Sequence, residues 1–435
     1  MPTAETPSTQ DARTEISAPP LADLLAVDQV AERYVRLVLA VGEHDDGYVD
    51  AYYGPGLWRT EVQTAQMPLA QIDAGAQAAV AQLQALQLPQ EPMVRLRQRF
   101  LQRQLEALSV HVRKLRGAQL RFNDEAKALY DVLPPALDRV ALTDQLNNLE
   151  TLLPAGKGTL SQRYNDYLQR FAIPADRLES VMRVTIDEAR RRTARRIKLP
   201  EGEQFELALV KDKPWSAYNW YQGNFLSRIE INTDLPVTAA RVIELAVHEG
   251  YPGHHVYNSL LEQALVRGRG WIEYCVYPLY SPQSLIAEGS ADFAIDLSFS
   301  IDERAAFYQE VLFPLAGFEP AEARRYAQIT EAAKFTGMAT IDAARNWLDG
   351  RATEQQVLKQ LQDEALATPE RARQRLAFFR GYRSYIVNYS LGEALVETYV
   401  QTLAGDDATT RWLVFADLLA SPALPADLEI PDPKK

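Results

Sequence analysis

The sequence predicts a mainly α-helical fold with a small β-sheet placed directly before a helix that carries histidines. Apolar residues recur at the i, i+3, i+4 spacing of amphipathic helices over most of the 435 residues. Two short stretches near the middle instead alternate apolar and polar residues, which is typical of half-buried strands. Three of the five histidines then fall within His248–His255. A cluster this dense in a histidine-poor chain favours a metal site.

The first 200 residues are predicted to be a tail and a helical region. Residues 1–20 are rich in Pro, Ser, Thr and Ala and predict a disordered tail, without the basic and long apolar segments of a secretory signal. Residues 21–200 form the N-terminal helical region. After a first helix that begins near residue 21, we expect helices at 69–85, 91–116, 124–133, 137–152, 161–171 and 174–198.

Residues 201–435 contain the sheet and the histidines, and we expect them to form one integrated domain with residues 21–200. Strands are predicted at 204–210 and 226–232, with the aromatic stretch 215–221 as a candidate third strand. A turn at Asp234–Thr238 then leads into a helix that ends with His248 and Glu249. The remaining helices are expected at 239–249, 256–266, 284–299, within 302–366, and within 371–403.

Composition excludes several classes of function. A net charge of −12 and a pI of about 5.1 argue against nucleic acid and against an anionic membrane surface as partners. No run of about 18 apolar residues is present, so we expect no membrane-spanning helix and a cytoplasmic protein. The single cysteine, Cys275, lies among tyrosine and valine residues and is expected to be a buried thiol. Composition does not indicate the oligomeric state.

His248-Glu249 opens the zinc-protease signature His-Glu-x-x-His, in which two histidines on one helix face hold zinc and the glutamate is the general base. Here Pro252 stands where the second histidine should be, and the next imidazoles are His254 and His255. In a straight helix His255 would lie about 10 Å along the axis from His248, and His254 would point to another face. Two bonds of about 2 Å to one zinc ion are therefore impossible in an unbroken helix.

Pro252 and Gly253 would allow two histidines to reach one metal ion, because they can break the helix between His248 and His254. Proline cannot donate the helical hydrogen bond and disturbs the preceding turn, and glycine permits unusual dihedral angles. A bulge or break at residues 251–253 would fold the next turn back toward His248. Geometry leaves His254 and His255 both open as the second ligand. We favour His254, with His255 as a supporting or substrate-contacting group; the competing interpretation is a Pro-Gly turn with surface histidines.

The third ligand of a catalytic zinc site is expected to be a carboxylate on a second helix. Glu288 fits, because it lies in a predicted helix of small and apolar residues. Asp292 follows one helical turn later and can accept the free N–H of a ligand histidine. Considered alone, each acid would be interpreted as a residue that caps its helix or forms a salt bridge. Together with the histidine cluster, they predict a zinc site of His248, His254 and Glu288.

The stretch 248–255, His-Glu-Gly-Tyr-Pro-Gly-His-His, resembles the His-Glu-x-x-Pro-Gly-His signature of the bacterial domain-of-unknown-function family numbered 885. That family is similar to the gluzincin metallopeptidases, which include thermolysin, carboxypeptidase Taq and angiotensin-converting enzyme. Its Glu-Gly-x-Ala segment matches residues 288–291, and its Tyr-x-x-Gly segment matches residues 389–392. The Pro-Gly-Gln element usual in the family is replaced by Ser-Tyr-Ile-Val-Asn at 384–388.

This resemblance implies a large helical, cleft-forming peptidase fold, with 201–435 as the gluzincin-like catalytic region. A sheet edge would pair with the substrate backbone, and Ile229–Asn232 would be that edge. Tyr389, or else Tyr382 or Tyr385, would donate a hydrogen bond to the oxyanion of the reaction. Arg383 would grip a carboxylate of the peptide.

These inferences predict a zinc-dependent peptidase in which Glu249 is the general base and a peptide is the substrate. Two alternatives stay open. One is a metal-dependent hydrolase of non-peptide amides that uses the same site. The other is a helical binding protein that has no catalytic activity.

Overall fold

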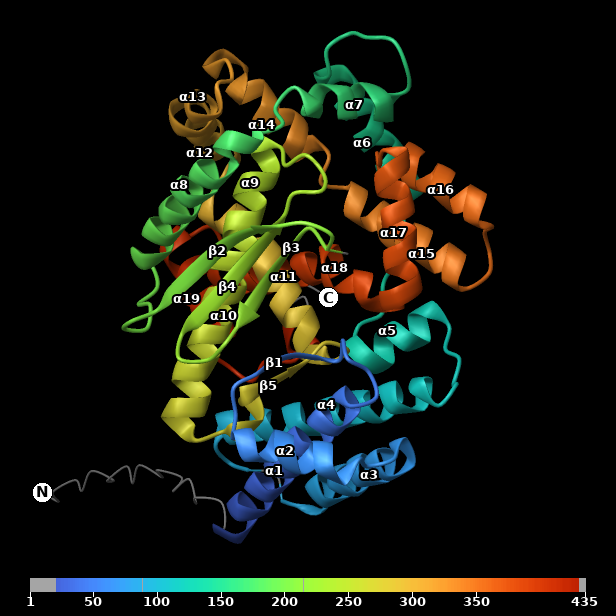
Figure 1. Ribbon diagram of the computed structural model, residues 1–435, viewed down its shortest axis with the longest axis vertical. Helices are drawn as coiled ribbons and strands as arrows, with labels where there is room; N and C mark the ends of the chain where they lie inside the picture. The colour runs from blue at the N-terminus through green and yellow to red at the C-terminus, as the bar shows by residue number, and fades with distance from the viewer. Residues whose placement is uncertain (1–20, 88, 214, 430–435) are drawn as a thin grey trace, which may run out of the picture.

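The structure is a computed structural model that describes residues 21–87, 89–213 and 215–429, so the predicted tail 1–20 lies outside the described residues (Figure 1). The fold is mainly helical with two small sheets, as predicted. The first five helices pack together at one end of the molecule (Figure 1). They are α1 (Leu21–Gly42), α2 (Gly56–Ala65), α3 (Leu69–Ala85), α4 (Pro92–Leu115) and α5 (Phe122–Tyr130).

One side of the molecule is built from the three-stranded sheet and the helices next to it (Figure 1). These elements are α8 (Ala175–Ala194), β2 (Gln204–Val210), β3 (Ala217–Tyr221), β4 (Leu226–Asn232) and α9 (Ala239–Leu245). The predicted strands and the candidate third strand are all present. The strand order is β2-β4-β3, with β2 parallel and β3 antiparallel to β4.

This order corrects one prediction. Ile229 lies on β4, and β4 is the central strand, because both of its sides carry ladder hydrogen bonds. The Ile229 side chain is buried in the core, and a Cβ on Gly250 would lie 3.8 Å from it. Ile229–Asn232 is therefore not a sheet edge. Within the described residues, the edges are β2 and β3.

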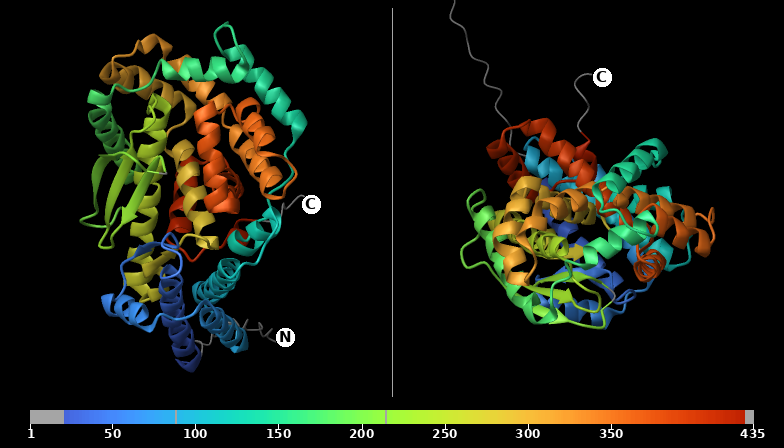
Figure 2. Two further views of the ribbon diagram at one scale, coloured as in Figure 1. Left: turned by 45° about the vertical axis from the view of Figure 1, so that its right-hand side comes forward. Right: turned by 90° about the horizontal axis from the view of Figure 1, so that it is seen from above.

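The opposite side is helical, and the long helix α11 runs between the two sides (Figure 2). The opposite side contains α6 (Arg139–Leu152), α7 (Leu160–Gln169), α15 (Thr336–Leu348), α16 (Glu354–Asp363) and α17 (Pro369–Tyr382). α11 (Pro282–Ser298) is buried along most of its length, as expected for a helix that is apolar or small all round. The helix that carries both predicted carboxylates is thus the central helix of the fold.

The remaining elements connect and cover these parts. The turns of 3-10 or π type are η1 (Ala246–Gly250), η2 (Glu262–Arg267), η3 (Ile272–Cys275), η4 (Tyr308–Leu312), η5 (Pro320–Glu322) and η6 (Arg383–Asn388). The other helices are α10 (His254–Leu261), α12 (Ile301–Phe307), α13 (Phe313–Ala316), α14 (Ala323–Ala332), α18 (Ser390–Ala404), α19 (Ala408–Leu419) and α20 (Pro425–Leu428). No helix in the described part of the chain has both the length and the apolarity needed to cross a bilayer.

A second sheet, which the sequence did not predict, joins the N-terminal helices to the centre of the fold. It pairs β1 (Val49–Tyr52) antiparallel with β5 (Val276–Pro278). Strands of three or four residues are too short to show a clear alternation of apolar and polar residues. Cys275, just before β5, is buried as expected, and burial raises the pKa of its thiol to about 12.

Two hydrophobic cores hold the fold together, and neither is confined to one side of residue 200. One core brings Ile186 of α8 together with Val247 of the histidine-bearing segment. The other brings Tyr34 of α1 together with Tyr385, which lies more than 300 residues later in the sequence. The packing of residues 201–435 therefore depends on the N-terminal helices.

Candidate metal centre

The helix that carries His248 breaks where Pro252 and Gly253 predict. α9 passes into the π-helical turn η1, the chain leaves the helix at Tyr251, and α10 begins at His254. The Tyr251–Pro252 peptide bond is cis. A Cβ on Gly253 would lie only 2.0 Å from the carbonyl oxygen of His248, so this close return of the backbone requires glycine. As a result, the rings of His248 and His254 lie 4.6 Å apart between centroids.

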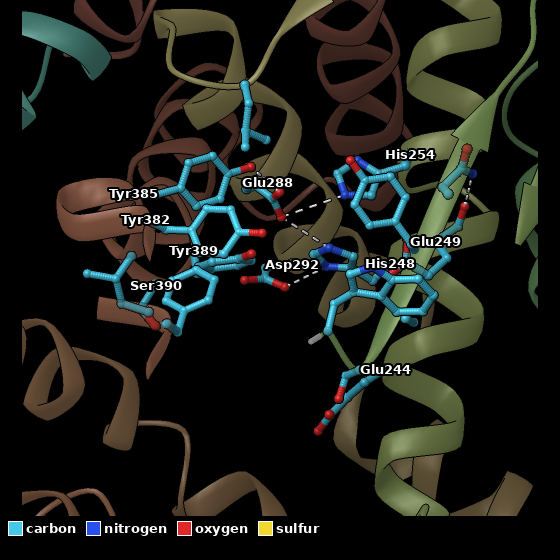
Figure 3. A pocket seen from close by; sticks show the side chains of 18 of the residues that line it. Glu244, His248, Glu249, His254, Glu288, Asp292, Tyr382, Tyr385, Tyr389 and Ser390 are labelled. Atoms are coloured by element: carbon cyan, nitrogen blue, oxygen red, sulfur yellow. Dashed lines mark hydrogen bonds and ion pairs between the residues drawn. The ribbon is translucent and has the colours of Figure 1, made fainter. Parts of the chain in front are cut away.

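Three side chains, from η1, α10 and α11, converge on one point (Figure 3). Nε2 of His248 lies 3.2 Å from Oε2 of Glu288, and Nε2 of His254 lies 3.6 Å from the same oxygen. Ligand atoms bound tetrahedrally at about 2.0–2.1 Å from a zinc ion lie roughly 3.3 Å from one another. Oε2 of Glu288 is buried and accepts no hydrogen bond from the described residues. The three atoms therefore fit a divalent metal ion.

Two further side chains orient these groups. Nδ1 of His248 lies 2.8 Å from Oδ1 of Asp292, the partner that the helical spacing predicted. The hydroxyl of Tyr385 donates to Oε1 of Glu288 at 2.7 Å. Each of these contacts leaves free the atom that faces the other ligands. The orientation of His248 and Glu288 is thus fixed by neighbours, as is usual around metal ligands.

Charges within the cluster balance one another. Burial alone would lower the pKa of His248, but Asp292 and Glu288 raise it well above its usual value. Burial alone would raise the pKa of Glu288, but the two imidazoles beside it bring that pKa well below its usual value. A bound metal cation would take the place of the protons on the histidines, so binding would release protons and weaken at low pH.

The glycines of the Glu-Gly-x-Ala segment at 288–291 and the Tyr-x-x-Gly segment at 389–392 have a physical role in this chain. Gly289 follows Glu288 on α11, and Gly392 lies three residues after Tyr389. A Cβ on Gly289 would lie 2.4 Å from the carbonyl carbon of Gly392, and a Cβ on Gly392 would lie 2.9 Å from Cα of Gly289. The backbones of α11 and α18 therefore touch, which brings Tyr389 close to the metal ligands.

The cluster lies in a cleft of about 700 Å³ that is lined by residues of both the sheet side and the helical side. Glu249 faces this cleft, and burial raises the pKa of its carboxyl, an effect that His248 and His254 partly offset. The side-chain amide of Asn219 on β3 donates to the backbone carbonyl of Glu249 at 2.6 Å. This bond fastens the edge strand β3 to the helix that carries the histidines.

Three tyrosines face His248, His254 and Glu288 from the opposite wall of the cleft (Figure 3). The ring of Tyr389 stacks on that of His248, with 6.5 Å between centroids. The hydroxyl of Tyr385 donates a hydrogen bond to Glu288, whereas the hydroxyl of Tyr389 makes no hydrogen bond to any described residue. Tyr382 also lines the cleft.

Two predicted site residues lie away from the cleft. His255 is fully buried and contacts Ser227 at 2.8 Å and Glu203 at 2.9 Å, so it ties α10 to the sheet side and cannot touch a substrate. The guanidinium of Arg383 donates to Glu125 at 2.7 Å and is not part of the cleft wall. The expected substrate contact of Arg383 is therefore wrong, and so is the substrate contact that was one of the two roles predicted for His255. Both side chains bind internal partners instead.

Asp50 on β1 was not identified from the sequence. It lines the cleft and accepts a hydrogen bond from the hydroxyl of Tyr218 on β3. Burial raises the pKa of Asp50 to about 6, although the Tyr218 bond opposes this shift. A single aspartate among other acids near a loop gives no periodic or motif signal, so only the fold could bring it to the cleft.

Comparisons with known proteins show a shared fold but do not identify an activity. No family model matches the sequence, and no curated protein matches it. The resemblance to family 885 therefore rests on the motifs alone.

Among solved structures, the chain is similar to a candidate lipoprotein from Colwellia psychrerythraea, with 15% identity and a TM-score of 0.52 over 85% of this chain. The chain spans 65% of that structure's length. It is also similar to a candidate lipoprotein of unknown function from Shewanella oneidensis, with 12% identity and a TM-score of 0.48, covering 85% of this chain and 75% of that one. A third similar structure is metallocarboxypeptidase 1 of Trypanosoma cruzi, with 14% identity and a TM-score of 0.44, covering 92% of this chain and 90% of that one. The first likeness establishes a shared fold.

Proposed function

We propose that this chain is a zinc-dependent peptidase. The observation that carries the proposal is the convergence of Nε2 of His248, Nε2 of His254 and Oε2 of Glu288 at tetrahedral spacing, with Glu249 beside them in a large cleft. Two imidazoles and one carboxylate are a ligand set that catalytic zinc uses, and they leave a fourth position for water or substrate.

The roles of the residues follow from their positions. Zinc held by these side chains would polarise the scissile carbonyl and acidify the attacking water. Glu249 accepts a proton from that water and passes it to the leaving amine nitrogen as the C–N bond breaks, and its raised pKa suits a group that must both take and give a proton. The hydroxyl of Tyr389 donates to the oxyanion that develops on the carbonyl oxygen.

The edge strand β3 is the proposed platform for the substrate backbone. Residues from Trp215 to Trp220 line the cleft, and β3 is paired with β4 on one side only. An extended peptide can add to such an edge through backbone hydrogen bonds. The bond from Asn219 to Glu249 supports this role, because it fixes the strand relative to the general base.

The test separates metal binding from chemistry. We expect purified protein to bind one zinc ion per chain and to hydrolyse members of a fluorogenic peptide library. Glu249→Gln should keep its zinc and lose about 10²- to 10⁴-fold in kcat. The matched control is Glu206→Gln, because Glu206 is an exposed carboxylate on β2, and it should leave both properties unchanged. Full activity of Glu249→Gln, or folded protein that binds no zinc, would refute the proposal.

The compartment is a separate question. The names of two similar structures call those proteins lipoproteins, whereas the composition of this chain predicts the cytoplasm. The proposed chemistry is the same in either compartment, and the chain has no disulfide that would require an oxidising one.

A further inference from the structure

A second chemical feature lies along the cleft from the metal ligands, where two helices bring arginines together. On α9, Arg241 precedes His248 by seven residues and lies on the same face of the helix. On α17, Arg371 and Arg375 are one turn apart. Arg241 and Arg375 line the main cleft, and Arg241 and Arg371 line a small hollow that adjoins it.

Most of this positive charge has no ion-pair partner among the described residues. Arg241 pairs with Glu244 at 3.0 Å. Within the described part of the chain, neither Arg371 nor Arg375 forms an ion pair, and the guanidinium of Arg375 has only a long hydrogen bond of 3.3 Å to the carbonyl of Ala365. Burial and then repulsion from Arg371 lower the pKa of Arg375 to about 10. Two half-buried guanidinium groups thus lie close together without an ion pair of their own, because the nearby carboxylate of Glu244 is engaged by Arg241. Such an arrangement is costly unless a further anion binds there.

The hollow has the size and continuity of a subsite. Its volume is about 60 Å³, enough for a carboxylate-sized group. Trp215, Ser216, Arg241 and Gln374 line both the hollow and the main cleft, so a bound chain can reach from one into the other. Trp215 and Ser216 also lead into β3, the proposed backbone platform. A peptide that follows β3 in this direction would arrive at the arginines.

We propose that Arg375, Arg371 and Arg241 form a subsite for a carboxylate of the peptide, supplied by its C-terminus or by an acidic side chain. The inference rests on the proposed peptidase function. Guanidinium groups bind carboxylates through paired, charge-assisted hydrogen bonds. Arg241 is seven residues from His248, which corresponds to roughly 10 Å along the helix. An extended peptide covers that distance in about three residues, so the carboxylate belongs about three residues from the bond that is cleaved.

Binding is measured first, so that failure of the subsite can be told from failure of the enzyme. The protein is Glu249→Gln, and the probes are three fluorescently labelled alanine-rich hexapeptides: one with a free C-terminal carboxylate, its C-terminal amide, and the amide with one internal glutamate. We expect at least one carboxylate-bearing probe to bind about 10- to 100-fold more tightly than the plain amide. The probe that binds more tightly than the plain amide shows whether the subsite takes a C-terminal carboxylate or an acidic side chain.

Adding Arg375→Met should remove this preference and leave binding of the plain amide within twofold. Methionine keeps the apolar length of the side chain, and circular dichroism verifies folding. The matched control is Arg373→Met on the same helix, because Arg373 is 62% exposed and pairs with Glu370 outside the cleft. It makes the same change in net charge and should keep the preference.

If the Glu249→Gln protein bound all three probes equally, the subsite proposal would be overturned before either arginine was changed. A preference for carboxylate that survives in Arg375→Met, or that Arg373→Met removes equally, would overturn it as well. Carboxylate-dependent binding in a protein that hydrolyses no peptide would support the subsite and refute the peptidase proposal. Moving the glutamate along the hexapeptide should shift the cleaved bond with it, at a spacing of about three residues.

Discussion

The two walls of the cleft are positioned in different ways. On one wall, His248, Glu249 and His254 come from a single short stretch, and the contact between Gly253 and the carbonyl of His248 fixes their relation locally. On the other wall, Tyr382, Tyr385 and Tyr389 come from η6 and the residues on either side of it, whose course depends on distant residues.

Glu125 is the main distant anchor of the tyrosine wall. It is almost fully buried on α5, and its carboxylate accepts hydrogen bonds from the guanidinium of Arg383 at 2.7 Å and the hydroxyl of Ser384 at 2.8 Å. Arg383 has a φ of 51°, in the left-handed region that non-glycine residues rarely adopt. The N-terminal helical region thus holds the bend that turns Tyr385 toward Glu288.

This difference between the two walls indicates that metal binding and the reaction can be altered by separate substitutions. A change in the histidine stretch should remove metal binding directly. A change in the anchors of the tyrosine wall should impair the reaction more than metal binding, which this wall contacts through the bond from Tyr385 to Glu288. The following substitutions test that separation, beginning with the one that should have the largest effect.

Gly253→Ala should abolish metal binding and activity. Its Cβ would lie 2.0 Å from a backbone oxygen that cannot move without unwinding the turn, so His254 must be displaced from His248. We expect zinc affinity to fall more than about 100-fold, because one of three protein ligands is misplaced, and stability to fall by about 3 kcal/mol. Metal content after dialysis and the midpoint of denaturant unfolding measure the two effects.

Gly381→Ala is the control for that change. Gly381 lies in α17, on the opposite side of the cleft, and a Cβ there would meet nothing within 4 Å. Alanine in a helix interior should be neutral or stabilising by up to about 1 kcal/mol. Zinc retention by Gly253→Ala at the parent affinity would show that His254 is not held by this backbone contact.

The same difference explains what the sequence could reveal. The convergence of His248, His254 and Glu288 was predictable, because the proline and glycine that break the helix stand beside the histidines, and Glu288 and Asp292 are one helical turn apart. The helical class and the three-stranded sheet were also predictable from periodicity. The roles of Ile229 and Arg383 were not, because strand order and the Glu125 contact depend on residues far away in the sequence. The sequence also did not predict that Arg241 of α9 would lie near Arg371 and Arg375 of α17, for the same reason.

Tyr389→Phe should have the next largest effect and should separate the tyrosines by role. Because its hydroxyl is free to meet the oxyanion, we expect kcat to fall about 10²- to 10³-fold with zinc affinity unchanged. Tyr385→Phe removes the donor to Glu288, so zinc affinity should fall about 10- to 100-fold. Steady-state kinetics at saturating zinc, together with zinc titration, distinguish the two. If the two variants lost kcat and zinc affinity in the same proportion, the assignment of separate roles would fail.

Glu125→Gln tests the distant anchor and should have the smallest effect on activity, about tenfold in kcat with zinc retained, by analogy with other groups that orient a catalytic residue. The effect on stability should be larger and should depend on pH. Burial alone would raise the pKa of Glu125, but Lys114 and Arg383 bring it below its usual 4.5. A carboxyl whose pKa is lower in the folded state stabilises the fold above pH 4.5, and this contribution is lost as the pH falls through the folded-state value.

Glutamine mimics the protonated carboxyl and leaves Arg383 and Lys114 without their partner. At pH 7 we therefore expect Glu125→Gln to be less stable by about 3 kcal/mol, the cost of breaking a buried ion pair. The gap from the parent protein should narrow as urea unfolding is repeated at lower pH, below 4.5. Glu354→Gln, which breaks the exposed pair with Arg380, should cost no more than about 0.5 kcal/mol. If Glu125→Gln also lost zinc, the two walls would not be independent, and the metal site itself would depend on the N-terminal helices.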